Sequence, residues 1–271
     1  MPRLYRSLGL GGGGTRGGLH IGALQAIYEI QGDLEFPDGI YGASVGGILA
    51  TAVAFHVDLN KLRTVYDKYF TLSSFIPTAT VDQVLTTFDR RGFSTIDPLI
   101  NLVLKVFDEC GIDLRGKRIC DAPQKLFIIA SNMTTGVTTL LTGRVPVLDA
   151  IRCTTAIPLV FEPQVLYGQV YLDPGVHLRC IRSVVPEEAL VVHISGKCAV
   201  ITPQSTLLEI LFASYSGRSL HYYGPNMVRI RNVNTGLLDE LTQADRNYLF
   251  REGYSQTLGF LTKRLAKEGP E

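Results

Sequence analysis

A serine between glycines stands at the junction of two apolar segments of the chain. Ser44 lies in the pentapeptide Gly-Ala-Ser-Val-Gly at residues 42–46, which has the G-x-S-x-G spacing of a nucleophile elbow. In such an elbow, small residues two positions either side of the serine let a strand turn sharply into a helix, and the turn lifts the hydroxyl clear of the backbone. The dipole of the following helix favours negative charge at this point. The spacing therefore predicts that Ser44 is a nucleophile at a strand–helix turn.

A run of glycines precedes this serine by about thirty residues, in the sequence Gly-Gly-Gly-Gly-Thr-Arg-Gly at residues 11–17. Consecutive N–H groups of such a loop can point at one site, which is what a developing oxyanion needs. Because the loop and the serine come in this order and so close together, the two patterns jointly indicate acyl transfer from an ester.

Other uses of the glycine run fit less well. Gly9, Gly11 and Gly14 satisfy G-x-G-x-x-G between a strand and a helix, which is the pattern of a dinucleotide site. That site expects an acidic residue at the end of the second strand, and residues 41–44 contain no carboxylate. A P-loop would end in Lys-Ser or Lys-Thr, which this run does not. A purely structural connection is the third interpretation, although so many glycines are costly in chain entropy.

The order of apolar segments predicts an α/β fold in three layers, α/β/α, with a mostly parallel central sheet, because strands alternate with helices. We expect one domain over residues 1–271, with a motif-bearing core at about 4–200 and a C-terminal strand and amphipathic helix at 226–267. Strands are predicted at residues 4–10, 39–41, 126–130, 137–141, 165–172, 189–194 and 227–230. Helices are predicted at about 19–32, 45–55, 58–70, 97–107, 149–155, 207–215 and, after a cap at Thr242, along 250–265.

Composition narrows the class of protein. A net charge of +1 without charge clusters argues against nucleic-acid binding. Five scattered cysteines without C-x-x-C spacing favour reduced thiols over disulfides or a zinc site.

Neither of two segments indicates a signal peptide or a membrane span. The start of the chain has no apolar signal region. The uncharged stretch 39–57 is about as long as a membrane-spanning helix, but it contains the elbow, so we interpret this stretch as a strand, a turn and a buried helix. We expect a cytoplasmic protein that can attach peripherally to membranes, and no cofactor or metal.

A serine nucleophile needs a base, and the sequence leaves two options. An α/β-hydrolase would use a histidine, here His177, His193 or His221, but that fold places several strands before its elbow, and only eight residues precede Gly9. The other option is a carboxylate acting directly on the serine. Asp173 closes an alternating segment and begins Asp-Pro-Gly, at what would be the carboxyl edge of the sheet. Taken alone, Asp-Pro-Gly is most often an ordinary surface turn.

Several blocks of the chain resemble the patatin-like phospholipases. Residues 12–17 resemble their G-G-G-x-[RK]-G oxyanion motif, and residues 42–46 resemble their serine elbow at the family's short distance. Residues 152–163, with A-x-P and F-x-P, look like their third block, and residues 130–136 resemble the turn after a central strand. Asp173 falls where the family carries D-G-G or D-G-A. The likeness covers most of residues 4–175 in the family's order.

The resemblance implies a Ser-Asp dyad that hydrolyses acyl esters of phospholipids and related lipids through an acyl-serine, without calcium. By carry-over, Ser44 is the nucleophile and Asp173 the general base. The N–H groups around Gly12, Gly13 and Gly14 bind the oxyanion, and Arg16 fixes that loop or favours the negative charge. The implied activity is that of a phospholipase A or lysophospholipase, with an acyl lipid as substrate and transient contact with a membrane surface.

One departure from the family pattern is Pro174, which stands where the family has glycine. Proline removes an N–H group and pushes the preceding residue towards extended backbone angles, so a catalytically weak lipid-binding protein is an alternative to an enzyme. The expected role of His20 is a satisfied polar contact. For the C-terminal helix, core packing is favoured over contact with a membrane.

Overall fold

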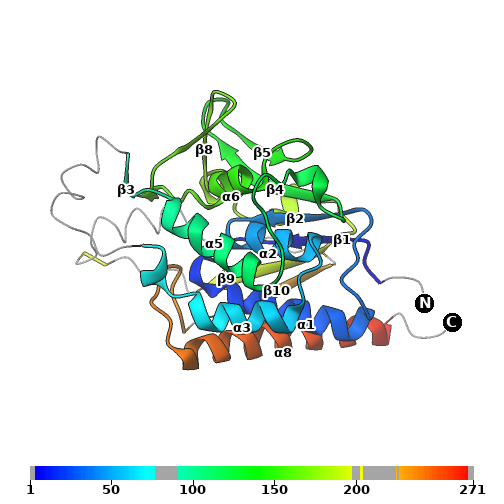
Figure 1. Cartoon of the computed structure of the whole chain (residues 1–271). Coiled ribbons are helices and arrows are strands. Elements are labelled where there is room, and N and C mark those ends of the chain that lie inside the picture. Colours follow the sequence, from blue (N-terminus) through cyan, green and yellow to red (C-terminus); the bar gives the residue numbers. More distant parts are fainter. Residues whose placement is uncertain are drawn as a thin grey trace.

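A mixed β-sheet forms the centre of the molecule (Figure 1). The computed structural model describes residues 4–76, 91–196, 202–203, 224, 226–232 and 234–267. In that part, five parallel strands lie in the order β10-β9-β1-β2-β4, and β8 and β7 continue the sheet in antiparallel pairing. The strands span β10 (Met227–Asn232), β9 (Leu190–Gly196), β1 (Ser7–Leu10), β2 (Gly39–Ala43), β4 (Leu126–Asn132), β8 (Gln169–Leu172), β7 (Gln164–Leu166) and β5 (Val137–Leu141), which pairs with β4.

In the described residues, α-helices cover one face of this sheet and short 3-10 helices cover the other, so the sheet is the middle of three layers, as in the expected α/β/α arrangement. The larger layer consists of α1 (Gly17–Gln31), α2 (Val45–Ala54), α3 (Leu59–Tyr69), α5 (Asp97–Glu109), α6 (Val147–Thr155) and α8 (Gln243–Lys267). Their apolar side chains form one core with Leu10, Ile40 and Ile128 of the sheet. The opposite face is covered by the 3-10 turns η4 (Pro174–Val176) and η5 (Ile181–Ser183), where a smaller core includes Tyr41 and Ile129. Adjacent residues of each central strand thus face opposite cores, as the period of two requires.

Shorter elements complete the described part. They are the 3-10 turns η1 (Gly14–Arg16), η2 (Leu72–Ser74) and η3 (Ile119–Asp121), together with β3 (Gly92–Ser94), which pairs in parallel with β6 (Leu159–Phe161) in a separate two-stranded sheet.

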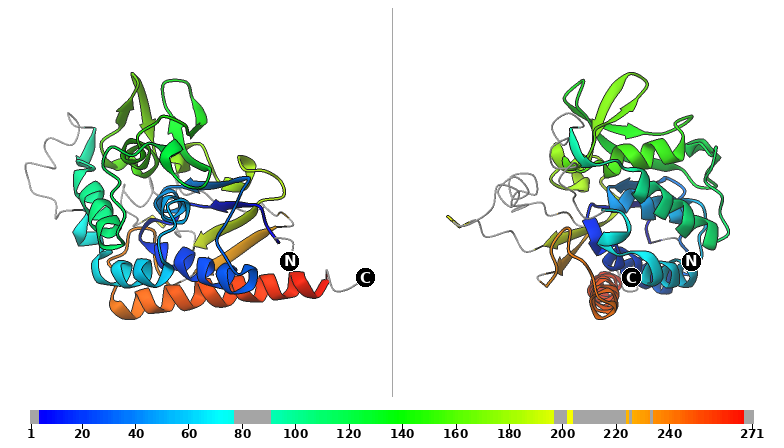
Figure 2. Two further views of the ribbon diagram at one scale, coloured as in Figure 1. Left: turned by 45° about the vertical axis from the view of Figure 1, so that its right-hand side comes forward. Right: turned by 60° about the vertical axis from the view of Figure 1, so that its left-hand side comes forward.

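The C-terminal helix α8 lies along α1 in every view, although the two helices are more than 200 residues apart in sequence (Figures 1 and 2). Glycines permit backbone contact between them. A Cβ on Gly22 would lie 2.1 Å from the Phe250 carbonyl oxygen, and one on Gly253 would lie 2.0 Å from the Leu19 carbonyl oxygen. The helix therefore packs on the α-helical layer, as expected. Its cap is also as expected, since the Asp245 amide donates to the Thr242 hydroxyl at 3.2 Å.

Most of the helices and strands expected from the sequence are present, but the prediction of one strand is wrong. Residues 165–172 were expected as a single strand, but they form the β7–β8 hairpin. Tyr167 and Gly168 have φ of 50° and 76°, and two consecutive positive φ values are those of a tight two-residue hairpin turn. The strands β3 and β6 were not foreseen. The expected helix at 207–215 lies outside the described residues.

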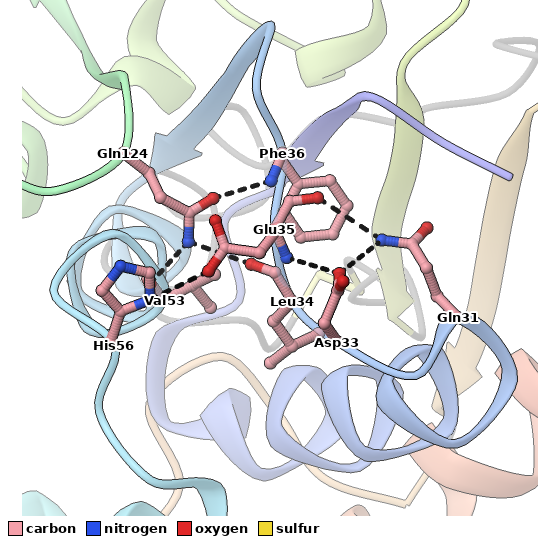
Figure 3. Close-up of polar contacts among 8 residues, drawn as sticks. All are labelled: Gln31, Asp33, Leu34, Glu35, Phe36, Val53, His56 and Gln124. Atoms are coloured by element: carbon pink, nitrogen blue, oxygen red, sulfur yellow. Dashed lines mark hydrogen bonds and ion pairs between the residues drawn. The ribbon is translucent and has the colours of Figure 1, made fainter. Parts of the chain in front are cut away.

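A buried glutamine fastens the loop that leads into β2 (Figure 3). The Gln124 amide nitrogen donates to the carbonyl oxygens of Leu34 at 3.0 Å and Val53 at 3.2 Å, and its oxygen accepts from the Phe36 amide at 2.7 Å. Beside this network, His56 Nδ1 lies 3.2 Å from a carboxylate oxygen of Glu35. The loop after α1 and the end of α2 are thereby held together, which fixes the approach of β2 to its turn.

Replacing Gln124 with leucine should lower the free energy of unfolding by about 2–4 kcal/mol, because the Phe36 amide and the Leu34 carbonyl lose their partner and the Val53 carbonyl keeps only the His56 amide. The measurement is urea denaturation followed by circular dichroism. Gln25→Leu is the matched control, since that side chain bonds only to exposed Glu29 and its loss should cost no more than about 0.5 kcal/mol. Equal stability of the Gln124→Leu and Gln25→Leu proteins would contradict this role.

Candidate active site

Ser44 occupies a strained turn between β2 and α2. Its φ of 55° and ψ of −129° lie outside the regions that L-residues normally adopt, at a cost of about 1–3 kcal/mol that the surrounding structure must offset. The flanking glycines are needed for space. A Cβ on Gly42 would lie 2.5 Å from the Gly46 carbonyl oxygen, and one on Gly46 would lie 2.2 Å from the Leu10 carbonyl oxygen. The G-x-S-x-G spacing thus lets the turn pack directly against the end of β1.

A threonine at the end of α6 holds this turn. The Ser44 amide donates to the Thr154 hydroxyl oxygen at 2.8 Å, and that hydroxyl donates to the Ile129 carbonyl of β4 at 2.5 Å. Thr154 is fully buried. In the sequence, Thr154 is one residue of the block at 152–163 and carries no sign of this role, because only the fold brings α6 to the turn.

Strand register brings Ser44 and Asp173 to one point of the sheet. β5 pairs with residues 128–132 of β4 and so occupies one edge of that strand. Because a strand has only two hydrogen-bonding edges, β2 and β8 must share the other edge. β2 is parallel to β4, and its last pair is Ala43 with Ile129. β8 is antiparallel to β4, and its last pair is Leu172 with Ser131. Ser44 follows Ala43 and Asp173 follows Leu172, so the register places both residues beside Ala130 of β4.

Asp173 caps the short turn that follows β8. Its Oδ1 accepts from the Gly175 amide at 2.9 Å, and its own amide donates to the Ala156 carbonyl at 2.9 Å. The residue is buried, with 4% of its surface exposed. Pro174 takes the first position of η4, where no N–H is needed, and Asp173 has the extended ψ of 138° that a residue before proline prefers. The turn therefore accommodates the proline that departs from the family pattern.

The end of α6 thus anchors both candidate residues. Thr154 receives the Ser44 amide and Ala156, two residues later, receives the Asp173 amide. This common attachment fixes the separation of the two backbones through a few short bonds.

The glycine loop lies beside the serine. A Cβ added to Gly12 would lie 3.5 Å from the Ser44 Cβ, and one added to Gly13 would lie 2.7 Å from Ile194. Gly14 has a φ of 58°, and a Cβ there would lie 1.9 Å from the Leu237 carbonyl oxygen. A Cβ at Gly12 would make only an ordinary contact, whereas a side chain at Gly13 or Gly14 would displace its neighbours, so the loop needs glycine at those two positions.

Two buried side chains bind carbonyl groups of this loop. His20 Nε2 lies 2.8 Å from the Gly11 carbonyl oxygen, and Arg16 Nε donates to the Gly13 carbonyl at 3.0 Å. Because a carbonyl only accepts, His20 carries its proton on Nε2. A trans peptide points its N–H away from its C=O, so anchoring these carbonyls turns the amides of Gly12 and Gly14 the opposite way. The expected satisfied contact of His20 is thus observed, together with a partner that sequence did not reveal.

Burial sets the charges beneath the loop. Burial lowers the pKa of Arg16 to about 10, opposed by the attraction of Asp239, so its guanidinium keeps its charge at neutral pH. Burial also lowers the pKa of His20 to about 4 and that of His193 to about 4, with Arg16 adding to both shifts. Arg16 therefore keeps its positive charge beneath the loop, beside two neutral imidazoles.

These histidines predict acid sensitivity of the fold. Between pH 6.5 and 4 the unfolded chain binds protons that the folded His20 and His193 do not, so the free energy of unfolding falls as pH drops through this window and is constant above it. Each imidazole contributes up to about 3 kcal/mol. His20→Gln keeps an N–H donor for Gly11 and should make the pH dependence shallower in urea denaturation. An unchanged slope would contradict the burial argument.

The other candidate bases are histidines. His177 is exposed, and its amide, not its ring, donates to the Ser131 hydroxyl at 3.3 Å. His193 lies beside Gly11. No imidazole of the described residues has a hydrogen bond to Ser44, and His221 lies outside them. Nor do the described residues contain a group of three or more metal-binding side chains.

Comparison with known proteins identifies the family of this chain. The family model described as patatin-like phospholipase matches residues 8–191, which is more than half of the chain. The chain therefore belongs to the patatin-like phospholipase family. Membership supports lipid hydrolase activity.

Solved structures show the same fold. VipD from Legionella pneumophila is similar over 96% of this chain and 67% of its own, with 17% identity and a TM-score of 0.57. The type III effector protein ExoU is similar over 96% of this chain and 53% of its own, with 17% identity and a TM-score of 0.51. The ExoU–SpcU complex from Pseudomonas aeruginosa gives a TM-score of 0.58 at 17% identity, over 97% of this chain and 52% of that one. This chain spans about half of the ExoU length, and the likeness concerns fold alone.

The uncharged stretch 39–57 forms β2, the Ser44 turn and α2, as expected. Within the described ranges, no helix combines the length and apolarity needed to cross a bilayer.

Proposed function

We propose that this protein hydrolyses carboxylic esters of lipids, as a phospholipase A or lysophospholipase, with Ser44 as nucleophile and Asp173 as general base. The observation that carries the proposal is the register of β2 and β8 on one edge of β4, which delivers both residues level with Ala130. The strained turn at Ser44 supports it, because backbone strain persists where function requires it.

In the proposed reaction, the Ser44 hydroxyl attacks the ester carbonyl carbon and its proton passes to the Asp173 carboxylate. The negative charge that develops on the carbonyl oxygen is stabilised by N–H groups of Gly12, Gly13 and Gly14 and by the N-terminus of α2. Collapse of the tetrahedral species expels the alcohol, which takes the proton from Asp173, and leaves an acyl-serine. Water then attacks the acyl carbon and gives a proton to Asp173. Collapse of this second tetrahedral species breaks the bond to the Ser44 oxygen, which takes that proton back from Asp173, and releases the fatty acid. Arg16 would act by fixing the loop and by its nearby positive charge.

Burial of Asp173 supports its role as a base. An aspartate is a weak base in water, and removal from water favours its protonated form, which makes it a better proton acceptor. The bond from Gly175 to Oδ1 orients the carboxylate. The fit of Pro174 in the turn favours an active enzyme over a lipid-binding protein without activity.

The proposal can be tested with a fluorophosphonate label and peptide mapping, alongside fatty acid release from phospholipid and lysophospholipid micelles. We expect one label, on Ser44, and release that requires Ser44. A label on a different serine would refute the assignment. Loss of labelling in His177→Gln or His221→Gln would favour the Ser-His-Asp esterase instead. Lipid binding without labelling or release would favour the inactive lipid-binding protein.

A further inference from the structure

Exposed apolar side chains are concentrated on two hairpins. Within the described residues, large hydrophobic side chains with high exposure include five on the β4–β5 and β7–β8 hairpins, namely Met133, Val137, Leu140, Val165 and Tyr167, which we call the hairpin surface. Tyr167 is 74% exposed and Val165 67%. The other two in the described residues, Tyr28 and Leu265, lie on α1 and α8 of the helical layer. Scattered exposed hydrophobic residues are ordinary, whereas a cluster marks a site of interaction.

The two hairpins form one continuous structure. The Met133 amide donates to the Val170 carbonyl at 2.8 Å, and the Val170 amide donates to the Thr134 hydroxyl at 2.9 Å. Val170 in turn pairs with Val165 across the β7–β8 hairpin. The turns of both hairpins project from the same end of the molecule in each view (Figures 1 and 2).

The two hairpins contain no charged side chains. Residues 126–143 and 163–172 contain no Asp, Glu, Lys or Arg, although such residues make up 19% of the chain. Exposed β-hairpins in soluble proteins usually carry charges that prevent association. Because the hairpins have neither positive nor negative side chains, a charged partner would find no opposite charge to pair with there.

The hairpin surface adjoins the candidate active site through the backbone. β8 runs from the turn at Tyr167 and Gly168 directly to Asp173, and β4 runs past Ala130 to the turn that begins at Met133. A lipid held at the two turns is therefore a few residues along either strand from Ala130, the level at which the strand register places Ser44 and Asp173.

We propose that the hairpin surface inserts into the apolar region of a lipid bilayer and holds the candidate active site at the membrane. This rests on the proposed function, since the substrate of a lipid hydrolase lies in that bilayer. Projecting turns with apolar side chains suit insertion between lipids better than contact with a flat protein face. Tyr167, with its polar tip, suits the boundary between headgroups and acyl chains. Without charges, the attachment is hydrophobic and does not depend on anionic lipid.

A tryptophan reporter tests this directly, because the chain contains no tryptophan. Tyr167→Trp and, as matched control, Tyr28→Trp are made in the Ser44→Ala background so that the vesicles stay intact. On addition of phosphatidylcholine vesicles, the emission of Trp at position 167 should shift to the blue, and that at position 28 should not. The shift should persist from about 0.05 to about 0.5 M salt, since screening weakens only charged contacts.

A second experiment measures the loss of attachment. Val165→Ser combined with Tyr167→Asn should weaken binding to phosphatidylcholine vesicles by about tenfold or more in co-sedimentation, because apolar area is lost. Both positions are exposed, and asparagine tolerates the positive φ of Tyr167, so folding should be unaffected. Tyr28→Ser combined with Leu265→Ser is the matched control and should bind as the unsubstituted chain does.

The outcomes separate this inference from the proposed function. The hairpin variant should hydrolyse a water-soluble short-chain ester at the unsubstituted rate and lose activity only on vesicles. No blue shift at position 167, with normal hydrolysis of the soluble ester, would overturn the membrane surface and leave the enzyme proposal intact. A blue shift that occurs without vesicles, at high protein concentration, would also overturn the membrane surface. It would indicate that the hairpin surface binds a second copy of the chain. Hydrolysis that survives Ser44→Ala would refute the enzyme proposal alone.

Discussion

Replacing Ser44 with alanine should lower kcat for ester hydrolysis by about 10⁴-fold or more, because the reaction loses the atom that forms the acyl intermediate. Ser44→Gly should be equally inactive but more stable than the unsubstituted protein, by about 1 kcal/mol. Glycine adopts a φ of 55° without the strain that serine bears there. Activity is measured as fatty acid release and stability as the urea midpoint.

Ser195→Ala is the matched control, since Ser195 is a buried serine whose hydroxyl donates to the Ile230 carbonyl, away from the turn. It should keep its activity and its labelling by fluorophosphonate. If the Ser44→Gly protein proved less stable than the unsubstituted chain, the turn would be relaxed rather than strained. If the Ser44→Ala protein kept its activity, the nucleophile would lie elsewhere.

Replacing Asp173 with asparagine should lower kcat by about 10³- to 10⁴-fold, because an amide cannot accept the serine proton. The substitution is nearly isosteric, and an asparagine oxygen can still accept from the Gly175 amide, so the turn should keep its shape. The thermal midpoint should therefore change little. KM should also change little, because the proton is transferred only as the bond forms.

The matched control for this change is Asp58→Asn. The Asp58 carboxylate caps α3 by accepting a hydrogen bond from the Lys61 amide at 2.9 Å. Like Asp173, it therefore accepts from a backbone amide at the start of a helical segment, but it is exposed at the start of α3 and does not lie beside Ser44. Full activity in both asparagine proteins would remove Asp173 from the proposed dyad. Unfolding of the Asp173→Asn protein, with Asp58→Asn intact, would mean that the carboxylate is structural.

Local sequence patterns predict the elements that carry Ser44 because each is governed by neighbours in the chain. Apolar runs and glycine spacing determine β2, the turn and α2, and the predicted positions agree with the structure to within a few residues. The end of α1 near Gly32 was predictable for the same reason, since glycine there adopts a φ of 86°.

The contacts that shape the site depend on residues far apart in sequence, so spacing alone could not identify them. Thr154 is 110 positions from Ser44, and it meets the serine only because α6 packs on β4. The β7–β8 hairpin was missed because its alternating apolar residues continue through a turn that Tyr167 and Gly168 form with positive φ. The binding of Gly11 by His20 depends on how the first helix leaves the loop.

The glycine loop is finished by a part of the chain that the family model does not reach. The Leu237 carbonyl accepts from the Thr15 amide at 2.9 Å and sits where any side chain at Gly14 would be, although the family match ends at residue 191. A fragment cut at that boundary would contain every motif by which the family is recognised and still lack the carbonyl group that closes the glycine loop. Recognition of the family and completion of the glycine loop therefore depend on different parts of the chain.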